Sequence, residues 1–293
     1  MKYLLPIFIL ISLAYSQDST TVAIITTDGT EIIGEIIEES DIEYQLKTPA
    51  GLTVTVPKNA VYKLSEFTGT IKEGKLFRPD PNKSLYLFAP SAYPIGKDGK
   101  YCRDFCVFFP SINYGLTDIL SAQAGIFWAP MVDIDKIPII GSLKASLFQQ
   151  DKIALAAGGM YIRFPTIDID DNDGEQDEIR VGGGFLFGTA TYGDHLNHAS
   201  LSLGWGFAQG EGEWETMDQP IVVIAGNKRI SQTLALVTEN WFWPELDLKY
   251  VPLSLSVRFL GKRIATDIGL VFNYELISEV RLPFPIINFT YHF

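Results

Sequence analysis

The sequence predicts an all-β protein: a twelve-stranded antiparallel transmembrane β-barrel preceded by a small N-terminal β-barrel domain. Apolar and polar residues alternate with a period of two through most of the chain, the spacing of half-buried strands. Beyond the first 16 residues, no run of about 18 apolar residues occurs, which excludes membrane-spanning helices. From Ser84 onward, short turns alternate with longer polar loops, an asymmetry typical of barrels that cross a membrane.

Residues 1–16 predict a secretory signal peptide. Lys2 supplies a positive charge, Leu4 to Leu13 form an apolar stretch, and Ala14-Tyr15-Ser16 offers small residues for cleavage before Gln17. This stretch of about ten apolar residues is too short to span a membrane as a helix. No cysteine follows the cleavage site, so we expect no lipid anchor. The alternative is a buried N-terminal strand.

Residues 17–66 predict a small domain of five short strands. The turn signals are Asp28-Gly29 and Pro49-Ala50-Gly51. The expected strands span residues 21–26, 31–38, 42–48, 52–57 and 61–66. Residues 67–83, which contain Gly, Pro and basic residues, predict a linker to the barrel of residues 84–293.

The small domain resembles the Sm-like or SH3-like barrels in its motifs V-A-I-I-T-T-D-G-T-E-I-I-G-E-I and V-P-K-N-A-V-Y-K-L. In the Sm-like family, this resemblance would imply RNA binding. Acidic residues outnumber basic ones about three to one across the segment, and the whole chain carries a net charge of −12. Such a charge repels phosphates, so we expect no nucleic acid. We expect instead a periplasmic interaction or plug domain with its own partner, or a plain folding module.

The turns of the larger part predict the number of strands. Five short turns and six longer connections make eleven connections, and therefore twelve strands, with both ends on the side of the short turns. The short turns are at residues 116–118, 149–151, 193–195, 227–229 and 261–263. The longer connections are near residues 92–100, 130–137, 165–178, 209–218, 244–249 and 274–283.

The alternation also predicts which side chains face lipid. Around the middle of the chain, the apolar positions Leu201, Leu203, Trp205 and Phe207 share one face, and Ser and Gly share the other. Charges on a lipid-facing surface are costly, so charged residues in strands are expected to face the lumen. These lumen charges are Lys144, Glu239, Arg258 and Asp267. They are compatible with a closed, salt-bridged interior and with a narrow polar pore alike.

The last ten residues, F-P-I-I-N-F-T-Y-H-F, place Ile287, Phe289, Tyr291 and Phe293 on one face of a strand. A chain-terminal Phe behind alternating apolar residues resembles the closing strand of bacterial outer-membrane β-barrels, where it is the assembly signal. The resemblance implies a location in the cell outer membrane, with lipid and the barrel-assembly machinery as partners.

Most of residues 84–293 also resembles a family of bacterial outer-membrane β-barrel proteins of unassigned function. The resemblance is carried by the stretch L-F-A-P-S-A-Y-P-I-G-K-D-G-K-Y-C-R-D-F-C-V-F-F-P-S-I-N-Y-G-L-T-D-I-L-S and by A-L-V-T-E-N-W-F. No catalytic or binding residues come with it.

Three other patterns are candidate sites. His198-Ala199-Ser200 has the His-x-Ser spacing of the outer-membrane phospholipase family, but its parity turns both side chains into the lumen. Asp171, Asp173 and Asp177 lie in an acidic stretch that resembles extracellular calcium loops and predict a weak Ca²⁺ site, with a solvated loop as the alternative. Cys102 and Cys106 are too far apart to pair along one strand, and pair only if the segment curls.

The sequence therefore predicts a structural or pore-forming outer-membrane protein, which passes small polar solutes if it is open. We expect no enzymatic activity and no cofactor apart from the Ca²⁺ hypothesis. Two alternatives stay open: a lipid hydrolase that uses His198 and Ser200, and a secreted all-β binding protein.

Overall fold

The computed structural model describes residues 21–67, 69–72, 75–128, 137–165, 167–170, 176–179, 181–210, 213–244, 246–261, 263–279 and 283–293. The predicted signal peptide lies outside these residues. The chain forms two compact units, residues 1–78 and residues 79–293. Among the described residues, no helix is long and apolar enough to cross a membrane.

The first unit contains a five-stranded antiparallel sheet in the order β4-β3-β2-β1-β5. Its strands are β1 (Thr21–Thr26), β2 (Glu31–Glu39), β3 (Glu43–Lys47), β4 (Thr53–Pro57) and β5 (Val61–Glu66), with the 3-10 helix η1 (Lys58–Ala60) before β5. Buried Val22, Ile24, Leu46 and Val56 form its core. β4 and β5 are the two edges of this sheet, so the pairing shows a sheet, and the Sm-like or SH3-like identity stays a prediction.

The two turn signals of the first unit lie between strands. Gly29 and Gly51 have φ angles of 84° and 83°, in the left-handed region that favours glycine. A two-stranded hairpin, β6 (Thr70–Lys72) and β7 (Lys75–Phe77), follows within the predicted linker.

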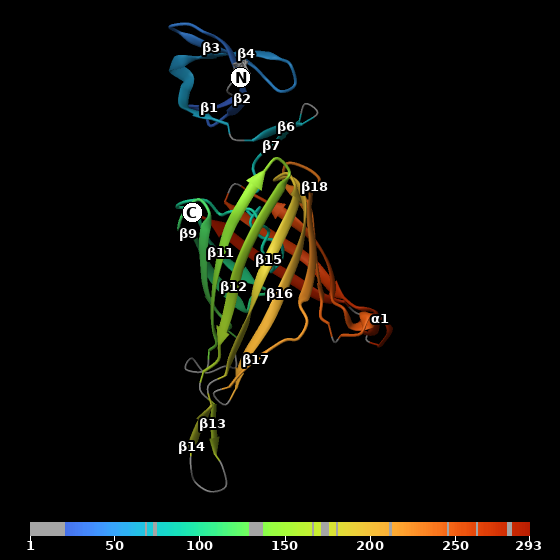
Figure 1. Cartoon of the computed structure of the whole chain (residues 1–293). Coiled ribbons are helices and arrows are strands. Elements are labelled where there is room, and N and C mark those ends of the chain that lie inside the picture. The colour runs from blue at the N-terminus through green and yellow to red at the C-terminus, as the bar shows by residue number, and fades with distance from the viewer. Residues whose placement is uncertain are drawn as a thin grey trace, which may run out of the picture. The chain divides into compact units, whose positions relative to one another are not determined.

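The second unit is a closed antiparallel barrel of twelve strands, as the sequence predicts (Figure 1). The first and last strands pair with each other, and the pairing of β15 with β16 completes the ring. Its strands are β8 (Lys100–Phe105), β9 (Phe109–Gly115), β10 (Leu120–Ile126), β11 (Ile139–Gln150), β12 (Ile153–Arg163), β15 (Gly182–Gly193), β16 (Asn197–Gly210), β18 (Ile221–Arg229), β19 (Leu234–Phe242), β20 (Leu253–Leu260), β21 (Ile264–Phe272) and β22 (Phe284–His292).

The connections at the two ends of the barrel differ in length. At the end where β8 begins and β22 ends, each connection is short; we call this the short-turn end. The opposite, long-loop end carries most of the longer connections. These include the hairpin β13 (Ile167–Asp170) and β14 (Gln176–Ile179), strand β17 (Glu213–Thr216), the 3-10 helix η3 (Leu248–Tyr250) and helix α1 (Tyr274–Glu279).

The structure corrects the sequence prediction in three places. Residues 227–229 belong to strand β18, and the turn follows at residues 230–233. The barrel wall begins at Lys100 rather than at Ser84, because residues 80–93 lie inside the barrel. A turn at residues 106–108 separates β8 from β9, so the strand count is unchanged. Cys106 and Val107 adopt φ angles of 54° and 67° there, a conformation that these residue types do not signal.

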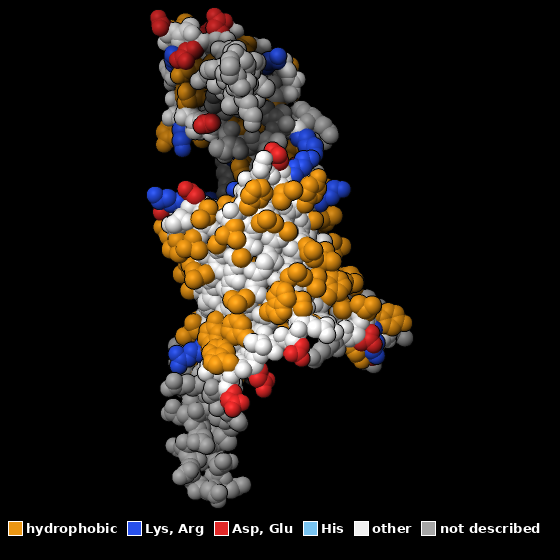
Figure 2. Space-filling model, viewed as in Figure 1, with side chains coloured by type: hydrophobic (Ala, Val, Ile, Leu, Met, Phe, Trp, Pro, Cys, Tyr) orange, Lys and Arg blue, Asp and Glu red, His pale blue; other side chains and the backbone are white. Residues whose placement is uncertain are grey.

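The outer face of the barrel is apolar and the inner face is polar. Leu201 is 50% exposed, whereas Ser200 and Ser202 on the same strand are 4% and 6% exposed. Hydrophobic side chains cover the visible outer face, and charged side chains gather toward its two ends (Figure 2). The described core of this unit therefore lies in the barrel lumen.

We expect Leu46→Ala to lower the free energy of unfolding of the first unit by about 2–5 kcal/mol, because it leaves a cavity among buried side chains. Hydrogen exchange of the Ile24 and Val56 amides in the full chain measures this change. Leu52→Ala, at a side chain that is 66% exposed, is the matched control. Equal effects of the two substitutions would contradict the assigned core.

Candidate functional site: a lumen closed by residues 79–99

We call residues 79–99 the inner segment; its part from residue 80 to residue 93 is largely buried in the barrel lumen. Tyr86 and Ala92 are fully buried, and Leu87 and Ala89 are 2% exposed. Within the inner segment, the Tyr86 N–H donates to the Ala89 carbonyl at 2.9 Å, which makes a tight turn at residues 86–89. A bridge between Leu85 and Pro90 closes the hairpin behind that turn.

Glu239 on β19 binds the tip of this hairpin. Its Oε2 accepts hydrogen bonds from the backbone N–H groups of Leu87, Phe88 and Ala89 at 2.9, 2.8 and 2.9 Å. Its Oε1 accepts a bond from the Trp241 indole at 2.8 Å. The carboxylate is 95% buried, and consecutive N–H groups in a turn form a concave site that favours an anion.

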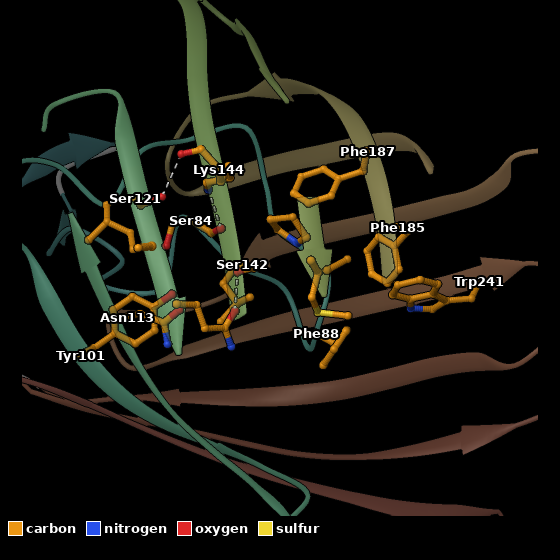
Figure 3. A pocket seen from close by; sticks show the side chains of 17 residues that line it. Ser84, Phe88, Tyr101, Asn113, Ser121, Ser142, Lys144, Phe185, Phe187 and Trp241 are labelled. Carbon is orange, nitrogen blue, oxygen red and sulfur yellow. Dashed lines mark hydrogen bonds between the residues drawn. The ribbon is translucent and has the colours of Figure 1, made fainter. Parts of the chain in front are cut away.

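Lys144 on β11 binds the two arms of the same hairpin from another side of the lumen. Its Nζ donates to the carbonyl oxygens of Ser84, Ser91 and Tyr93 at 3.2, 2.9 and 2.7 Å. Among the described residues, no carboxylate forms an ion pair with it. All three ammonium hydrogens are therefore used by backbone carbonyls. Figure 3 shows Lys144 beside Ser84.

Arg258 and Asp267 complete the set of charged contacts. They lie opposite each other on β20 and β21 and form a bidentate pair, with Nε–Oδ1 at 2.6 Å and Nη2–Oδ2 at 3.1 Å. The guanidinium also donates to the carbonyls of Leu85 and Tyr86 at 3.2 and 2.7 Å. Both side chains are at least 98% buried. The pair thus holds the inner segment as well as its own two strands.

Nearer the short-turn end, hydrogen bonds between uncharged groups also hold the inner segment against the barrel wall. The Tyr86 and Ser200 hydroxyls lie 2.6 Å apart, and Ser200 bonds in turn to Thr191. Further contacts include Ala92 N–H to Thr191 at 2.8 Å, Tyr93 hydroxyl to the Gly193 carbonyl at 3.0 Å, and Asn82 to His292 at 2.7 Å.

The His198–Ser200 pair is packed beneath the inner segment. The His198 ring lies between Tyr86 and Tyr93, at centroid distances of 5.3 and 5.2 Å, and its Nδ1 bonds to the Asp194 carbonyl. The described contacts of the Ser200 hydroxyl are with Tyr86 and Thr191, and none joins it to His198. This arrangement is that of a packed lumen wall, without a base bonded to a nucleophile.

The lumen on the long-loop side of the hairpin tip is aromatic. Phe88 packs against Phe105 and Trp241 at centroid distances of 5.3 and 6.1 Å, and Trp241 packs against Phe185 at 6.0 Å. A cavity of about 60 Å³ lies here, with Ser142 and Lys144 at one end and aromatic rings, Phe187 among them, at the other (Figure 3). The hairpin thus separates a polar part of the lumen from an aromatic part.

The other residues singled out in the sequence do not join this site. Asp171 and Asp173 lie outside the described residues, and Asp177 lies in β14 with its side chain undescribed, so the Ca²⁺ hypothesis stays a prediction. Within the described part of the chain, no three acidic, His or Cys side chains gather as a metal site. Cys102 and Cys106 are free thiols. Ile287, Phe289, Tyr291 and Phe293 lie exposed, the first three on the outer face of the last strand.

Comparisons with known proteins add little to this geometry. No family model matches the chain, and no curated protein matches it. Among solved structures, the trimer form of in-vitro folded OmpT, an outer membrane protein of Vibrio cholerae, is 12% identical with a TM-score of 0.37, over 93% of this chain and 96% of that one. Outer-membrane expressed OmpT of Vibrio cholerae is 11% identical with a TM-score of 0.34, over 94% and 95%. Such values describe a similarity between β-barrels alone.

We expect Glu239→Ala to loosen the hairpin tip, because three N–H groups lose their shared acceptor. A hydrogen bond to a charged group contributes about 1.5–3 kcal/mol, so exchange of the Leu87, Phe88 and Ala89 amides should accelerate about tenfold or more. Added formate should slow the exchange again by occupying the vacated site. Glu213→Ala, at an exposed carboxylate on β17, is the control. Unchanged exchange in Glu239→Ala would show that the carboxylate does not hold the tip.

Proposed function

We propose that this protein is a transmembrane β-barrel of the bacterial outer membrane, with a lumen that the inner segment closes. The observation that carries the proposal is the distribution of side chains on the closed barrel. Exposed apolar side chains such as Leu203 and Leu255 cover the outside, while Lys144, Arg258 and Asp267 are buried inside. A closed ladder with an apolar outside and a polar inside satisfies its backbone in lipid.

The location in the outer membrane is supported by the signal-peptide pattern of residues 1–16 and by the terminal strand. Strands rather than helices cross this membrane in such proteins. The first strand of the barrel begins and its last strand finishes at the short-turn end, so we expect this end to face the periplasm. The five-stranded sheet, which precedes the barrel in sequence, would then be periplasmic too. Outer-membrane lipid and the barrel-assembly machinery are then its first partners.

The inner segment argues for a barrel that is closed at rest. Passage of small polar solutes would require this segment to leave its contacts with Glu239, Lys144 and Arg258, which belong to three different strands. Residue 79 follows the first unit directly in sequence. A periplasmic partner that binds the five-stranded sheet would therefore act on the inner segment through the backbone, as a release mechanism. No enzymatic step and no cofactor enter this proposal.

We expect Leu203→Arg to destabilise the barrel in lipid vesicles by about 2–4 kcal/mol, because it places a charge on the lipid-facing surface. Leu116→Arg, at an exposed side chain in a turn of the short-turn end, should cost about 0–1 kcal/mol. Denaturant titration followed by gel mobility of folded and unfolded protein measures both. A secreted soluble protein would tolerate arginine equally at the two exposed positions.

In planar bilayers, we expect the refolded protein to be silent or to open rarely. The double variant Lys144→Met and Glu239→Ala, which removes two anchors of the inner segment, should give frequent ion-conducting steps. Glu213→Ala serves as the variant with unchanged behaviour. Steady, large steps in the unmodified protein would contradict a lumen closed by the inner segment.

A further inference from the structure

The wall of the barrel is incomplete between β19 and β20. Their backbone ladder runs from Leu234–Phe259 to Val237–Ser256 and ends there. Both strands continue toward the long-loop end, where β19 pairs with β18 up to Phe242 and β20 pairs with β21 from Leu253. We call the stretch where residues 238–242 face residues 253–255 the β19–β20 seam.

Side chains take the place of the backbone ladder in the seam. The Thr238 hydroxyl donates to the Ser254 carbonyl at 2.6 Å, and the Ser254 N–H donates to Asn240 Oδ1 at 3.1 Å. The Ser254 hydroxyl accepts from the Glu239 N–H at 2.9 Å and donates to the Glu239 carbonyl at 2.6 Å. Four backbone groups that lipid would leave unpaired are thus satisfied. These bonds can be released by rotation of three side chains, without separation of a ladder.

Apolar surfaces lie on both sides of the seam. On the outside, Leu253 and Leu255 are 38% and 52% exposed. On the inside, Trp241 lines the 60 Å³ cavity and a second cavity of about 20 Å³. A third hollow, of about 320 Å³, opens at the long-loop end and shares Phe185 and Ile221 with the second. The seam therefore separates an apolar exterior from small cavities whose lining around Trp241 is aromatic.

We propose that the β19–β20 seam is a lateral entrance through which one acyl chain of a membrane lipid reaches the aromatic lumen around Trp241. This inference rests on the proposed membrane location. The occupant follows from the chemistry of the path: Phe88, Phe185 and Trp241 offer apolar contact, and the nearby Glu239 carboxylate is already engaged by four hydrogen bonds. The last few carbons of a slender, flexible apolar chain match cavities of about 60 and 20 Å³.

Quenching of tryptophan fluorescence by lipids with brominated acyl chains tests the inference. Three single-tryptophan proteins are refolded into vesicles of phosphatidylcholine with and without bromine: one retains Trp241, one retains Trp205 on the outer face, and one carries Tyr93→Trp near the short-turn end of the lumen. All other tryptophans are replaced by Phe. We expect quenching of Trp205 and of Trp241, and none at position 93.

A disulfide across the seam distinguishes quenching by an acyl chain that has entered the lumen from quenching by lipid that stays outside the wall. Thr238 and Leu255 follow Val237 and Ser256 in register, so Thr238→Cys and Leu255→Cys, in a Cys102→Ser and Cys106→Ser background, would staple the seam. Oxidation should abolish the quenching of Trp241, and a reductant should restore it, while Trp205 is unaffected in its own stapled variant.

The outcomes distinguish this inference from the proposed function. Absence of quenching at Trp205 would overturn the membrane location, and the lateral entrance with it. Quenching at Trp205 without quenching at Trp241 would overturn the entrance alone. Quenching of Trp241 that persists in the oxidised staple would show that the bromine acts through a closed wall, which also overturns the entrance.

Discussion

The backbone of the inner segment must find hydrogen-bond partners inside the barrel, and the arrangement of the lumen depends on this requirement. Glu239 accepts from three of its N–H groups, Lys144 donates to three of its carbonyls, and Arg258 donates to two more. A buried charge without partners is costly, and so is a buried peptide group. Here the buried charges and the buried peptide groups bond to each other, and each offsets the desolvation cost of the other. Removal of one of these side chains would leave its peptide partners buried without a hydrogen bond, at the full cost of their desolvation, as in other buried polar networks.

These hydrogen bonds change how the charged residues on the inner wall of the barrel are interpreted. The charges on the inner wall suggest at first a charged pore, but Arg258 and Asp267 neutralise each other, and Lys144 and Glu239 are directed at peptide groups. Arg103 and Arg229 are two further buried cations of the barrel wall. Beyond the hairpin tip, Phe88 and Trp241 replace polar side chains altogether. The lumen is therefore built as a packed interior with two chemically distinct parts, rather than as a uniform channel.

Much of the fold could be predicted from the sequence. Period-two alternation was sufficient for the face of each side chain, because the face follows directly from parity in a strand. The predicted count of twelve strands is right because two errors cancel: the stretch from Ser84 is not part of the wall, and residues 100–115 form two strands, β8 and β9. The inner segment could not be predicted in this way. Its stretch around Leu85 and Leu87 alternates like a strand, and the partners of Lys144 and Glu239 are peptide groups, which are the same in every residue. The one available signal was the spacing of Pro90, Pro94, Gly96 and Gly99, which disfavours a continuous strand. The turn at Cys106 and Val107 carries no glycine or asparagine and gave no signal at all.

The position of the inner segment at the start of the second unit imposes an order on folding. Asn82 bonds to His292 and Leu87 to Glu239, across sequence separations of 210 and 152 residues. Residues 79–99 are thus synthesised before the strands of the barrel wall, and the contact of Asn82 with His292 forms only when the final strand is in place. Contacts between residues that are so far apart in the sequence form slowly. Until then, the peptide groups of this hairpin have to bond to water or to another protein, because their partners in the barrel are not yet in place.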